Sequence, residues 1–325
     1  MSTPSKSIIA LVQMDCAGES DDVLSRAIGH IRTAANQGAR IVCLPELFRS
    51  LYFCQTEDAA AFALAEPLPG PTTAALGKIA QEKRVAVLAP VFERRAAGIY
   101  HNSLALLNEC GELAGVYRKM HIPDDPQVHE KFYFTPGDLG FKAFDTETAR
   151  IGTLICWDQW YPEAARLTAL QGAAVLFYPT AIGWLPEEKE ACGEAQYDAW
   201  LTVQRGHAIA NGVYVAAVNR IGFEPTPDGS SGIEFWGRSF IVDPQGVVLA
   251  QASTDREEIV MAEMDLAHLE MIRRTWPFFR DRRIDAYGGL EQRWGEFIAT
   301  HQAQLRRDLS TLQREPSEDG GTSDR

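Results

Sequence analysis

Hydrophobic residues along the chain alternate between short continuous runs and helical stripes. Apolar runs rich in β-branched side chains predict buried strands, and residues 8–12 and 39–44 form the first two. Between them, residues 21–37 carry apolar side chains at helical spacing, and Gly38 follows where a helix would end. This strand–helix–strand order predicts an α/β fold.

The alternation continues through most of the chain. Residues 103–108 and 113–118 predict a hairpin whose turn contains Gly111, where a positive φ is favoured. Antiparallel hairpins beside parallel units predict mixed sheets. The other expected strands are residues 85–91, 151–155, 173–178, 213–218, 238–242, 247–251 and 257–263, and the other expected helices are residues 71–83, 162–171, 194–211 and 266–274.

One pattern occurs twice. Residues 8–44 and 151–178 each contain a strand, an amphipathic helix, a Gly-Ala pair and a second strand. Glycine ends helices in many proteins, so the general construction of such units explains the match as readily as an ancient duplication does. Both explanations stay open from the sequence.

The composition is that of a globular protein. The 325 residues are 46% hydrophobic and 23% charged, which is sufficient for a large core. We expect an N-terminal tail at residues 1–7, a single domain at residues 8–309, and a disordered C-terminal tail at residues 310–325 that is polar and glycine-rich.

Charge and cysteine content argue against several classes of protein. The net charge of −13 opposes a nucleic-acid partner, and no apolar run is long enough to span a membrane. Six cysteines are scattered singly and residues 1–7 do not resemble a signal peptide, so we expect a cytoplasmic protein with free thiols. No cluster of metal ligands at characteristic spacing occurs, and we expect neither a metal nor another cofactor.

Cys156 lies where a buried strand gives way to the expected start of a helix. It follows the apolar run at residues 151–155, and Pro162 and Glu163 are typical of a first helical turn. Backbone N–H groups and the helix dipole at such a junction lower the pKa of a thiol, which makes Cys156 a candidate nucleophile. Taken alone, a buried structural cysteine is the commoner explanation.

Three charged residues occupy positions that polar side chains normally avoid. Glu46 follows the strand at residues 39–44, at a strand end where ligands bind in open α/β sheets. Lys119 ends the strand segment at residues 116–120, and Glu130 lies in an aromatic-rich loop. Singly, each is explained by contact with solvent or by a surface salt bridge.

Together, these motifs resemble those of the nitrilase, or carbon–nitrogen hydrolase, superfamily. The matching segments are Leu44-Pro-Glu-Leu-Phe48, Tyr117-Arg-Lys-Met-His121 and Cys156-Trp-Asp-Gln-Trp-Tyr-Pro-Glu163, in the order found in the family. The resemblance covers roughly residues 8–290. It implies an αββα sandwich that pairs with a second subunit through its helical face, and hydrolysis of non-peptide C–N bonds.

The resemblance also implies a role for each residue. Glu46 would act as general base for Cys156, and Lys119 with the backbone N–H of Trp157 would stabilise the oxyanion. Glu130 matches a further glutamate of the family that positions the substrate.

Other segments narrow the choice of substrate. Leu51-Tyr-Phe-Cys-Gln55 and Phe177-Tyr-Pro-Thr-Ala-Ile-Gly183 resemble a branch of the family that hydrolyses a cationic ureide, a carbamoylated diamine. Such a substrate needs an apolar sleeve that ends in a carboxylate. Candidates are Tyr52, Phe53, Trp157 and Trp184 for the sleeve, and Asp125, Glu187 or Glu188 for its end. The chain departs from this branch at residues 127–129, so the contacts at that edge of the pocket do not follow from the resemblance.

Other functions stay open. An enzyme acting on β-ureidopropionate or on N-carbamoyl amino acids needs an arginine for the substrate carboxylate, and Arg205 and Arg220 are available. A catalytically inactive regulatory or scaffold domain is opposed by the intact Glu46, Lys119 and Cys156. A Cys-His protease is opposed by the lack of a protease signature around any cysteine or histidine.

The segment at residues 276–287 combines several aromatic and arginine side chains. Such side chains are enriched at protein interfaces. With the resemblance, this segment predicts a homodimer or a higher homo-oligomer.

Overall fold

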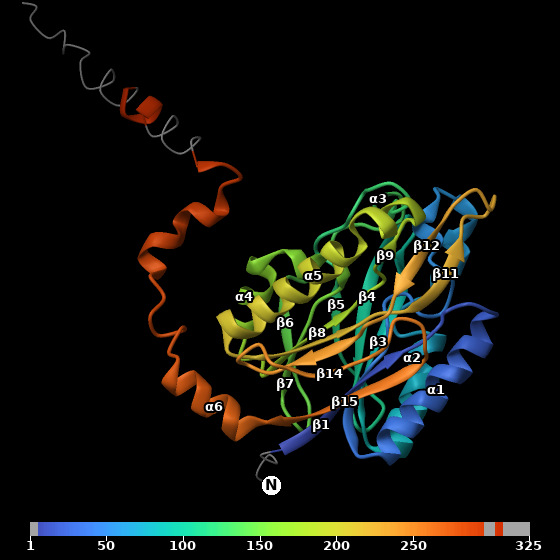
Figure 1. The fold of residues 1–325 in the computed structure, drawn as a ribbon, viewed down its shortest axis with the longest axis horizontal. Helices are drawn as coiled ribbons and strands as arrows, with labels where there is room; N and C mark the ends of the chain where they lie inside the picture. The colour runs from blue at the N-terminus through green and yellow to red at the C-terminus, as the bar shows by residue number, and fades with distance from the viewer. Residues whose placement is uncertain (1–5, 296–302, 308–325) are drawn as a thin grey trace, which may run out of the picture. The chain divides into compact units, whose positions relative to one another are not determined.

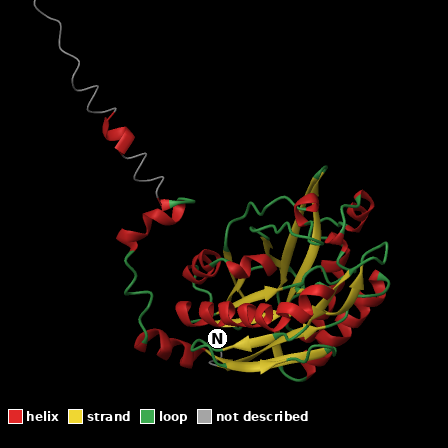
Figure 2. Cartoon of the chain, turned by 45° about the horizontal axis from the view of Figure 1, so that its top comes forward, coloured by secondary structure: helices red, strands yellow, loops and turns green. Residues whose placement is uncertain are grey.

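The computed structural model describes residues 6–295 and 303–307 of the chain. It divides into two compact units, Met1–Phe278 and Phe279–Arg325, and the first contains both large sheets and the helices that cover them. Figures 1 and 2 show the strands of this first unit as inner layers, with helices lying over them.

The first sheet is covered by helices α1 (Ser20–Asn36) and α2 (Pro71–Lys83). Its strands are β1 (Lys6–Gln13), β2 (Ala39–Cys43), β3 (Ala86–Ala96), β4 (Ile99–Leu107), β5 (Leu113–Arg118) and β15 (Glu258–Asp265), in the spatial order β15-β1-β2-β3-β4-β5. β1, β2 and β3 run parallel, whereas β4, β5 and β15 are antiparallel to their neighbours.

The second sheet is covered by helices α4 (Pro162–Leu170) and α5 (Pro186–Asn211). Its strands are β6 (Lys142–Asp145), β7 (Arg150–Thr153), β8 (Val175–Pro179), β10 (Tyr214–Val218), β13 (Phe240–Val242) and β14 (Val248–Gln251), in the order β14-β13-β10-β8-β7-β6. The two sheets face each other, with β1 near β10, so the predicted αββα sandwich with mixed sheets is confirmed.

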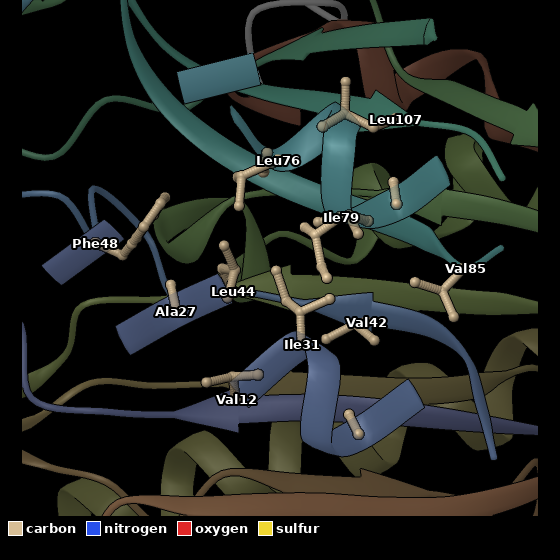
Figure 3. Packing of buried hydrophobic residues seen from close by; sticks show 14 of the residues in the cluster. Val12, Ala27, Ile31, Val42, Leu44, Phe48, Leu76, Ile79, Val85 and Leu107 are labelled. Carbon is tan, nitrogen blue, oxygen red and sulfur yellow. The ribbon is translucent and has the colours of Figure 1, made fainter. Parts of the chain in front are cut away.

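The layers follow from the positions of the apolar side chains. The central strands are buried on both faces because one face meets helices and the other meets the second sheet. α1 is amphipathic, and its buried residues Val23, Ala27, Ile31 and Ala34 recur every three or four positions. Figure 3 shows Ile31 among the side chains of α2 and of the strands that complete this core.

The two sheets repeat one topology. In the first, β1, α1, β2, α2 and β3 are followed by the antiparallel strands β4 and β5. In the second, β7, α4, β8, α5 and β10 are followed by β13 and β14. The sequence repeat at residues 8–44 and 151–178 is therefore the beginning of two halves of similar topology.

A third, smaller sheet was not predicted from the sequence. It contains β9 (Gly183–Trp184), β11 (Ile221–Pro225) and β12 (Gly232–Trp236), in the order β11-β12-β9. The short β9 lies far along the chain from the other two strands, so no local periodicity marks it. The remaining elements are α3 (Glu130–Tyr133), α6 (Leu266–Thr275) and 3-10 turns at Phe53–Gln55, Ala59–Leu64, Cys156–Trp160 and Ile284–Glu291.

Some local predictions are confirmed and some boundaries differ. Gly111, in the turn of the predicted hairpin, has a φ of +80°. α5 begins at Pro186, well before the expected residue 194, because a proline suits the first helical position and the Glu188 carboxylate accepts the N–H of Leu185. β1 begins at Lys6, inside the expected N-terminal tail. The expected C-terminal tail at residues 310–325 lies outside the described residues.

In the part of the chain that the structure describes, no helix combines the length and the apolar character needed to cross a bilayer.

Candidate active site

The charged residues singled out in the sequence converge at the carboxyl ends of strands from both sheets. Glu46 follows β2, Lys119 follows β5, and Cys156 follows β7. Backbone groups and side chains are free to face a ligand at such ends, because the strands no longer use them in pairing. The sandwich brings these three loops together from distant parts of the chain.

Lys119 lies between two carboxylates. Its Nζ donates to Oε1 of Glu46 at 2.8 Å and to Oε2 of Glu130 at 2.7 Å. All three residues are at most 1% exposed. An ammonium group has three N–H donors, so one donor of Lys119 is left for another acceptor.

This arrangement shifts the pKa values of two groups in the site. Burial alone would lower the pKa of Lys119, but the carboxylates of Glu130 and Glu46 raise it well above its ordinary value. Lys119 is therefore a permanent cation. Burial, together with the charge of Glu46, raises the pKa of Glu130 to about 7 against the opposing effect of Lys119.

The two oxygens of Glu46 differ in their contacts. Oε1 accepts from Lys119 and also from Nδ2 of Asn102 at 2.7 Å, whereas Oε2 is buried and has no hydrogen-bond partner among the described residues. Oε2 is thus the oxygen available to take a proton. Asn102 was not predicted as a site residue, because a single asparagine within a strand has no distinctive sequence pattern.

Glu130 is held from its other side by Tyr52. The Tyr52 hydroxyl donates to Oε1 of Glu130 at 2.8 Å, and its backbone N–H donates to the Glu224 carboxylate. Tyr52 is 2% exposed and also lines the cavity described below. The predicted residue Tyr52 therefore contacts the site through Glu130.

Arg220 supports the loop that carries Glu46. It is fully buried and pairs with Glu224 at 2.9 Å. Its guanidinium also donates to the backbone carbonyls of Glu46 and Leu47, at 2.7 and 2.9 Å, and of Ser50 at 3.1 Å. Arg220 thus holds backbone and does not line the cavity.

Cys156 has an unusual backbone conformation. Its φ of +42° lies in the left-handed region, which costs a non-glycine residue about 1–2 kcal/mol. It begins the 3-10 turn Cys156–Trp160, and its Sγ lies 3.9 Å from the carbonyl oxygen of Ala181. Cys156 is buried, and it lines the cavity described below, where a substrate can reach its sulfur.

The expectation of a lowered thiol pKa is wrong. Burial, followed by the charge of Glu46, raises the pKa of Cys156 well above its ordinary value. The helix dipole that the sequence suggested does not act at Cys156, because a short 3-10 turn follows it and the helix α4 begins only at Pro162. A neutral thiol in this position needs a neighbouring base to become a nucleophile.

A cavity of about 470 Å³ opens next to Cys156. Its walls are largely aromatic and aliphatic, and its charged lining residues are Asp125, Glu130 and Glu188. Among the described residues, no lysine, arginine or histidine lines it. The aromatic lining residues are Tyr52, Trp157, Trp160, Phe235 and Trp236.

Three of the predicted substrate-binding residues lie elsewhere. Trp184 is buried against Trp236 and donates to the carbonyl of Gly193, because β9 turns it into the core instead of the cavity. Glu187 faces solvent on α5, one residue before the cavity-lining Glu188. Phe53 stacks in a neighbouring aromatic cluster.

Sequence reasoning missed several cavity residues, among them two aromatic ones on a strand that it did not predict. Phe235 and Trp236 belong to β12, in the small sheet that the sequence did not predict. Their aromatic character within residues 232–236 was the available signal, but nothing local connects that segment with Cys156.

The divergent loop at residues 127–129 forms part of the cavity edge. Gln127 has a φ of +57° and donates to Oγ of Ser231 at 2.8 Å, and Val128 lines the cavity. The N–H of His129 donates to the carbonyl of Cys54. One side-chain hydrogen bond and one backbone hydrogen bond therefore hold this loop just before Glu130.

Arg205 is the other arginine considered for a carboxylate-bearing substrate. Its Nε donates to the carbonyl of Gly246 at 2.8 Å, and it does not line the cavity. Within residues 6–295 and 303–307, no three His, Cys, Asp or Glu side chains are grouped so that they could hold a metal ion.

Comparison with known proteins shows a resemblance to carbon-nitrogen hydrolases over most of the chain. Residues 8–274 match the family described as Carbon-nitrogen hydrolase. The chain is 44% identical over 283 residues to N-carbamoylputrescine amidase of Arabidopsis thaliana, covering 86% of this chain and 93% of that one. It is 39% identical over 286 residues to a citrullinase of Francisella tularensis subsp. tularensis, covering 88% and 98%. Among solved structures, a carbon-nitrogen hydrolase from Helicobacter pylori G27 matches with a TM-score of 0.86 and 46% identity, covering 89% of this chain and 100% of that chain.

Proposed function

The chain belongs to the carbon-nitrogen hydrolase family and is an amidohydrolase, and on this premise we propose that it hydrolyses N-carbamoylputrescine to putrescine, carbon dioxide and ammonia. Plant relatives named N-carbamoylputrescine amidase are 44% identical to this chain over more than nine-tenths of their own length. The chemistry and the choice of substrate are supported by separate features of the site.

The negative charge of the cavity is the observation that supports the choice of substrate. N-carbamoylputrescine has a neutral ureide at one end and an ammonium group at the other, joined by a methylene chain. With Glu130 engaged by Lys119, the carboxylates of Asp125 and Glu188 are available for the ammonium. The aromatic walls suit the methylene chain.

The first half of the reaction is attack by Cys156 on the ureido carbon. Oε2 of Glu46 takes the thiol proton as the sulfur forms its bond to carbon. The remaining N–H of Lys119 and the backbone N–H of Trp157 stabilise the oxyanion. Glu130 positions the substrate from the other side of Lys119.

The second half releases the products. Glu46 returns its proton to the leaving nitrogen, and ammonia departs. A water molecule, deprotonated by Glu46, then attacks the carbamoyl thioester on Cys156. The carbamate that forms loses carbon dioxide and leaves putrescine.

Ureides that end in a carboxylate are the second candidate class. Citrulline ends in an ammonium and a carboxylate, and one relative is a citrullinase. N-carbamoyl amino acids such as β-ureidopropionate also end in a carboxylate. Their recognition calls for a basic side chain, and none of the described cavity residues is basic.

Steady-state kinetics on three ureides test the assignment. We expect kcat/KM for N-carbamoylputrescine to exceed that for citrulline and for β-ureidopropionate by about a hundredfold or more, because two of the three substrates bring an unpaired carboxylate into an acidic cavity. A higher kcat/KM for either carboxylate-bearing ureide would overturn the proposed assignment of N-carbamoylputrescine as the substrate.

The nucleophile is tested by Cys156→Ala and Cys156→Ser. Both variants are expected to lose ureide hydrolysis, because the nucleophile is gone. They should keep the wild-type circular dichroism spectrum, because the new side chain is similar in size and the substitution removes no buried charge. Exposed Cys192→Ser serves as the matched control and should retain full activity. Turnover by the Cys156 variants would refute the mechanism, and activity that depends on Cys156 would exclude an inactive scaffold domain.

We further propose that the enzyme is a cytoplasmic homodimer or higher homo-oligomer. In the second unit, Ile284, Leu290 and Trp294 are 74%, 65% and 70% exposed, which is unusual for large apolar side chains outside an interface. All six cysteines are free thiols, as a reducing compartment favours.

A further inference from the structure

Asp158 is a buried carboxylate that does not line the cavity. Its Oδ1 accepts from the backbone N–H of His121 at 3.0 Å and lies 2.7 Å from Nδ1 of the same residue. Its Oδ2 accepts from the hydroxyl of Tyr117 at 2.6 Å and from the backbone N–H of Ile155 at 3.0 Å. A carboxylate offers only acceptors, so the ring of His121 carries its proton on Nδ1.

The donors to Asp158 come from the two segments that carry the proposed catalytic pair. Tyr117 and His121 each lie two residues from Lys119, and Ile155 directly precedes Cys156. One carboxylate therefore joins the end of β5 to the turn after β7. These segments are brought together only by the face-to-face packing of the two sheets.

The same carboxylate closes the strained turn at Cys156. The backbone N–H of Asp158 donates to the carbonyl of Ile155 at 3.0 Å, while its side chain accepts the N–H of Ile155. Two hydrogen bonds thus enclose the left-handed conformation of Cys156. Beside them, the His121 ring stacks on Tyr161 with centroids 3.7 Å apart and planes 5° from parallel.

We propose that Asp158 is a positioning residue that sets where the Lys119 ammonium lies relative to the Cys156 thiol. This inference rests on the proposed function, in which the sulfur attacks a carbon while Lys119 receives the oxygen on that carbon. A displacement of about 1 Å in such a geometry lowers a rate about a hundredfold. Asp158 acts through these two groups and does not touch the substrate.

Asp158→Asn is the sharpest substitution. The side chain keeps its shape, but one oxygen becomes an NH₂ donor. If that donor faces Ile155, the backbone N–H there loses its acceptor, and if it faces His121, the backbone N–H of that residue does. Either orientation loosens one of the two joined segments.

The measurement compares two reactions of the same sulfur. Hydrolysis needs Cys156, its base Glu46 and the oxyanion donor Lys119, whereas alkylation by iodoacetamide forms no oxyanion and needs only the thiol and the base that deprotonates it. We expect Asp158→Asn to lower kcat by about a hundredfold, with KM changed less than about threefold. Alkylation of Cys156, followed by peptide mass spectrometry, should stay within about threefold of the wild-type rate.

Two further variants control this test. Tyr117→Phe removes one donor but leaves both backbone bonds, and we expect a loss in kcat of at most about tenfold. Asp243→Asn makes the same chemical change in the turn between β13 and β14, where the carboxylate also accepts backbone N–H groups. Its kcat should stay within about twofold of wild type.

Two outcomes would overturn the inference. One is wild-type kcat in Asp158→Asn. The other is an equal loss of hydrolysis and alkylation, because Asp158 would then support only the fold of the nucleophile turn. The assays use whichever ureide the wild-type enzyme hydrolyses fastest, so a wrong substrate leaves this test intact, and the Cys156 variants test the proposed mechanism separately.

Discussion

Most hydrogen-bonding groups of Lys119 and Glu46 already have partners within the protein. Lys119 donates two of its N–H groups to Glu46 and Glu130, which leaves one N–H for a ligand. One oxygen of Glu46 accepts hydrogen bonds, and the other has no partner among the described residues. The unused donor and the unused acceptor are the two groups that acyl transfer needs. Burial makes each of them strong, because no water competes.

The pKa of Glu130 leads to a prediction about stability. The pKa is about 7 in the folded protein and 4.5 for an unperturbed glutamate, so the folded state keeps a proton that the unfolded state has released. This contribution to stability is complete below pH 4.5 and is lost as the pH rises through about 7. Its size is on the order of 3 kcal/mol.

Glu130→Gln removes that titration. We expect the free energy of unfolding of the variant, relative to wild type, to increase by up to about 3 kcal/mol between pH 5 and pH 8 in urea titrations. Exposed Glu57→Gln is the matched control and should follow the wild-type pH dependence. Equal pH dependence of Glu130→Gln and wild type would contradict the raised pKa.

At the scale of elements, the start of α5 decides which of two neighbouring glutamates faces the cavity. The helix begins at Pro186, and its first turn presents Glu188 to the cavity and Glu187 to solvent. Adjacent residues on a helix point about 100° apart, so one register decides which glutamate meets a ligand. The sequence contains both and does not distinguish them.

Glu188→Gln therefore tests the proposed contact with the substrate ammonium. We expect KM for N-carbamoylputrescine to rise about tenfold to a hundredfold, which corresponds to the loss of one charge-assisted hydrogen bond. Glu187→Gln makes the same change one residue away and should leave KM within about twofold of wild type. Similar effects of both substitutions would indicate a general effect of charge on the cavity and would contradict a specific contact.

At the scale of the whole molecule, the two sheets and the second unit have different roles. The repeated topology brings strand ends from both halves to one edge, and the proposed site uses β2 and β5 from one sheet and β7 from the other. Neither half could form the site alone. The second unit contributes exposed apolar side chains instead.

Those side chains predict the behaviour of the protein in solution. Ile284→Asp places a charge in the proposed interface and should shift the mass from light scattering towards the monomer at micromolar concentration. Asp285→Asn, on the neighbouring exposed residue, should leave the mass unchanged. A wild-type chain that is a stable monomer would refute the proposed oligomer.

Much of this could be predicted from local sequence, and the failures have a common cause. The strands of both large sheets, except β6, and the residues Glu46, Lys119 and Cys156 lie in patterns that a few neighbouring positions reveal. Trp184 and Glu187 were placed wrongly because their side-chain directions depend on β9 and on the register of α5. Asn102, Asp158 and Trp236 were missed because their partners are distant in sequence.

The sequence by itself determined most strands and helices of the two large layers, the family and the three residues proposed to carry the chemistry, because periodicity and short motifs are local properties. The tertiary structure decided which oxygen of Glu46 is free, why the Cys156 thiol is neutral, and that the cavity is acidic. These properties depend on burial and on contacts between segments far apart in the chain. No local pattern contains that information, because it arises only when the two sheets pack together.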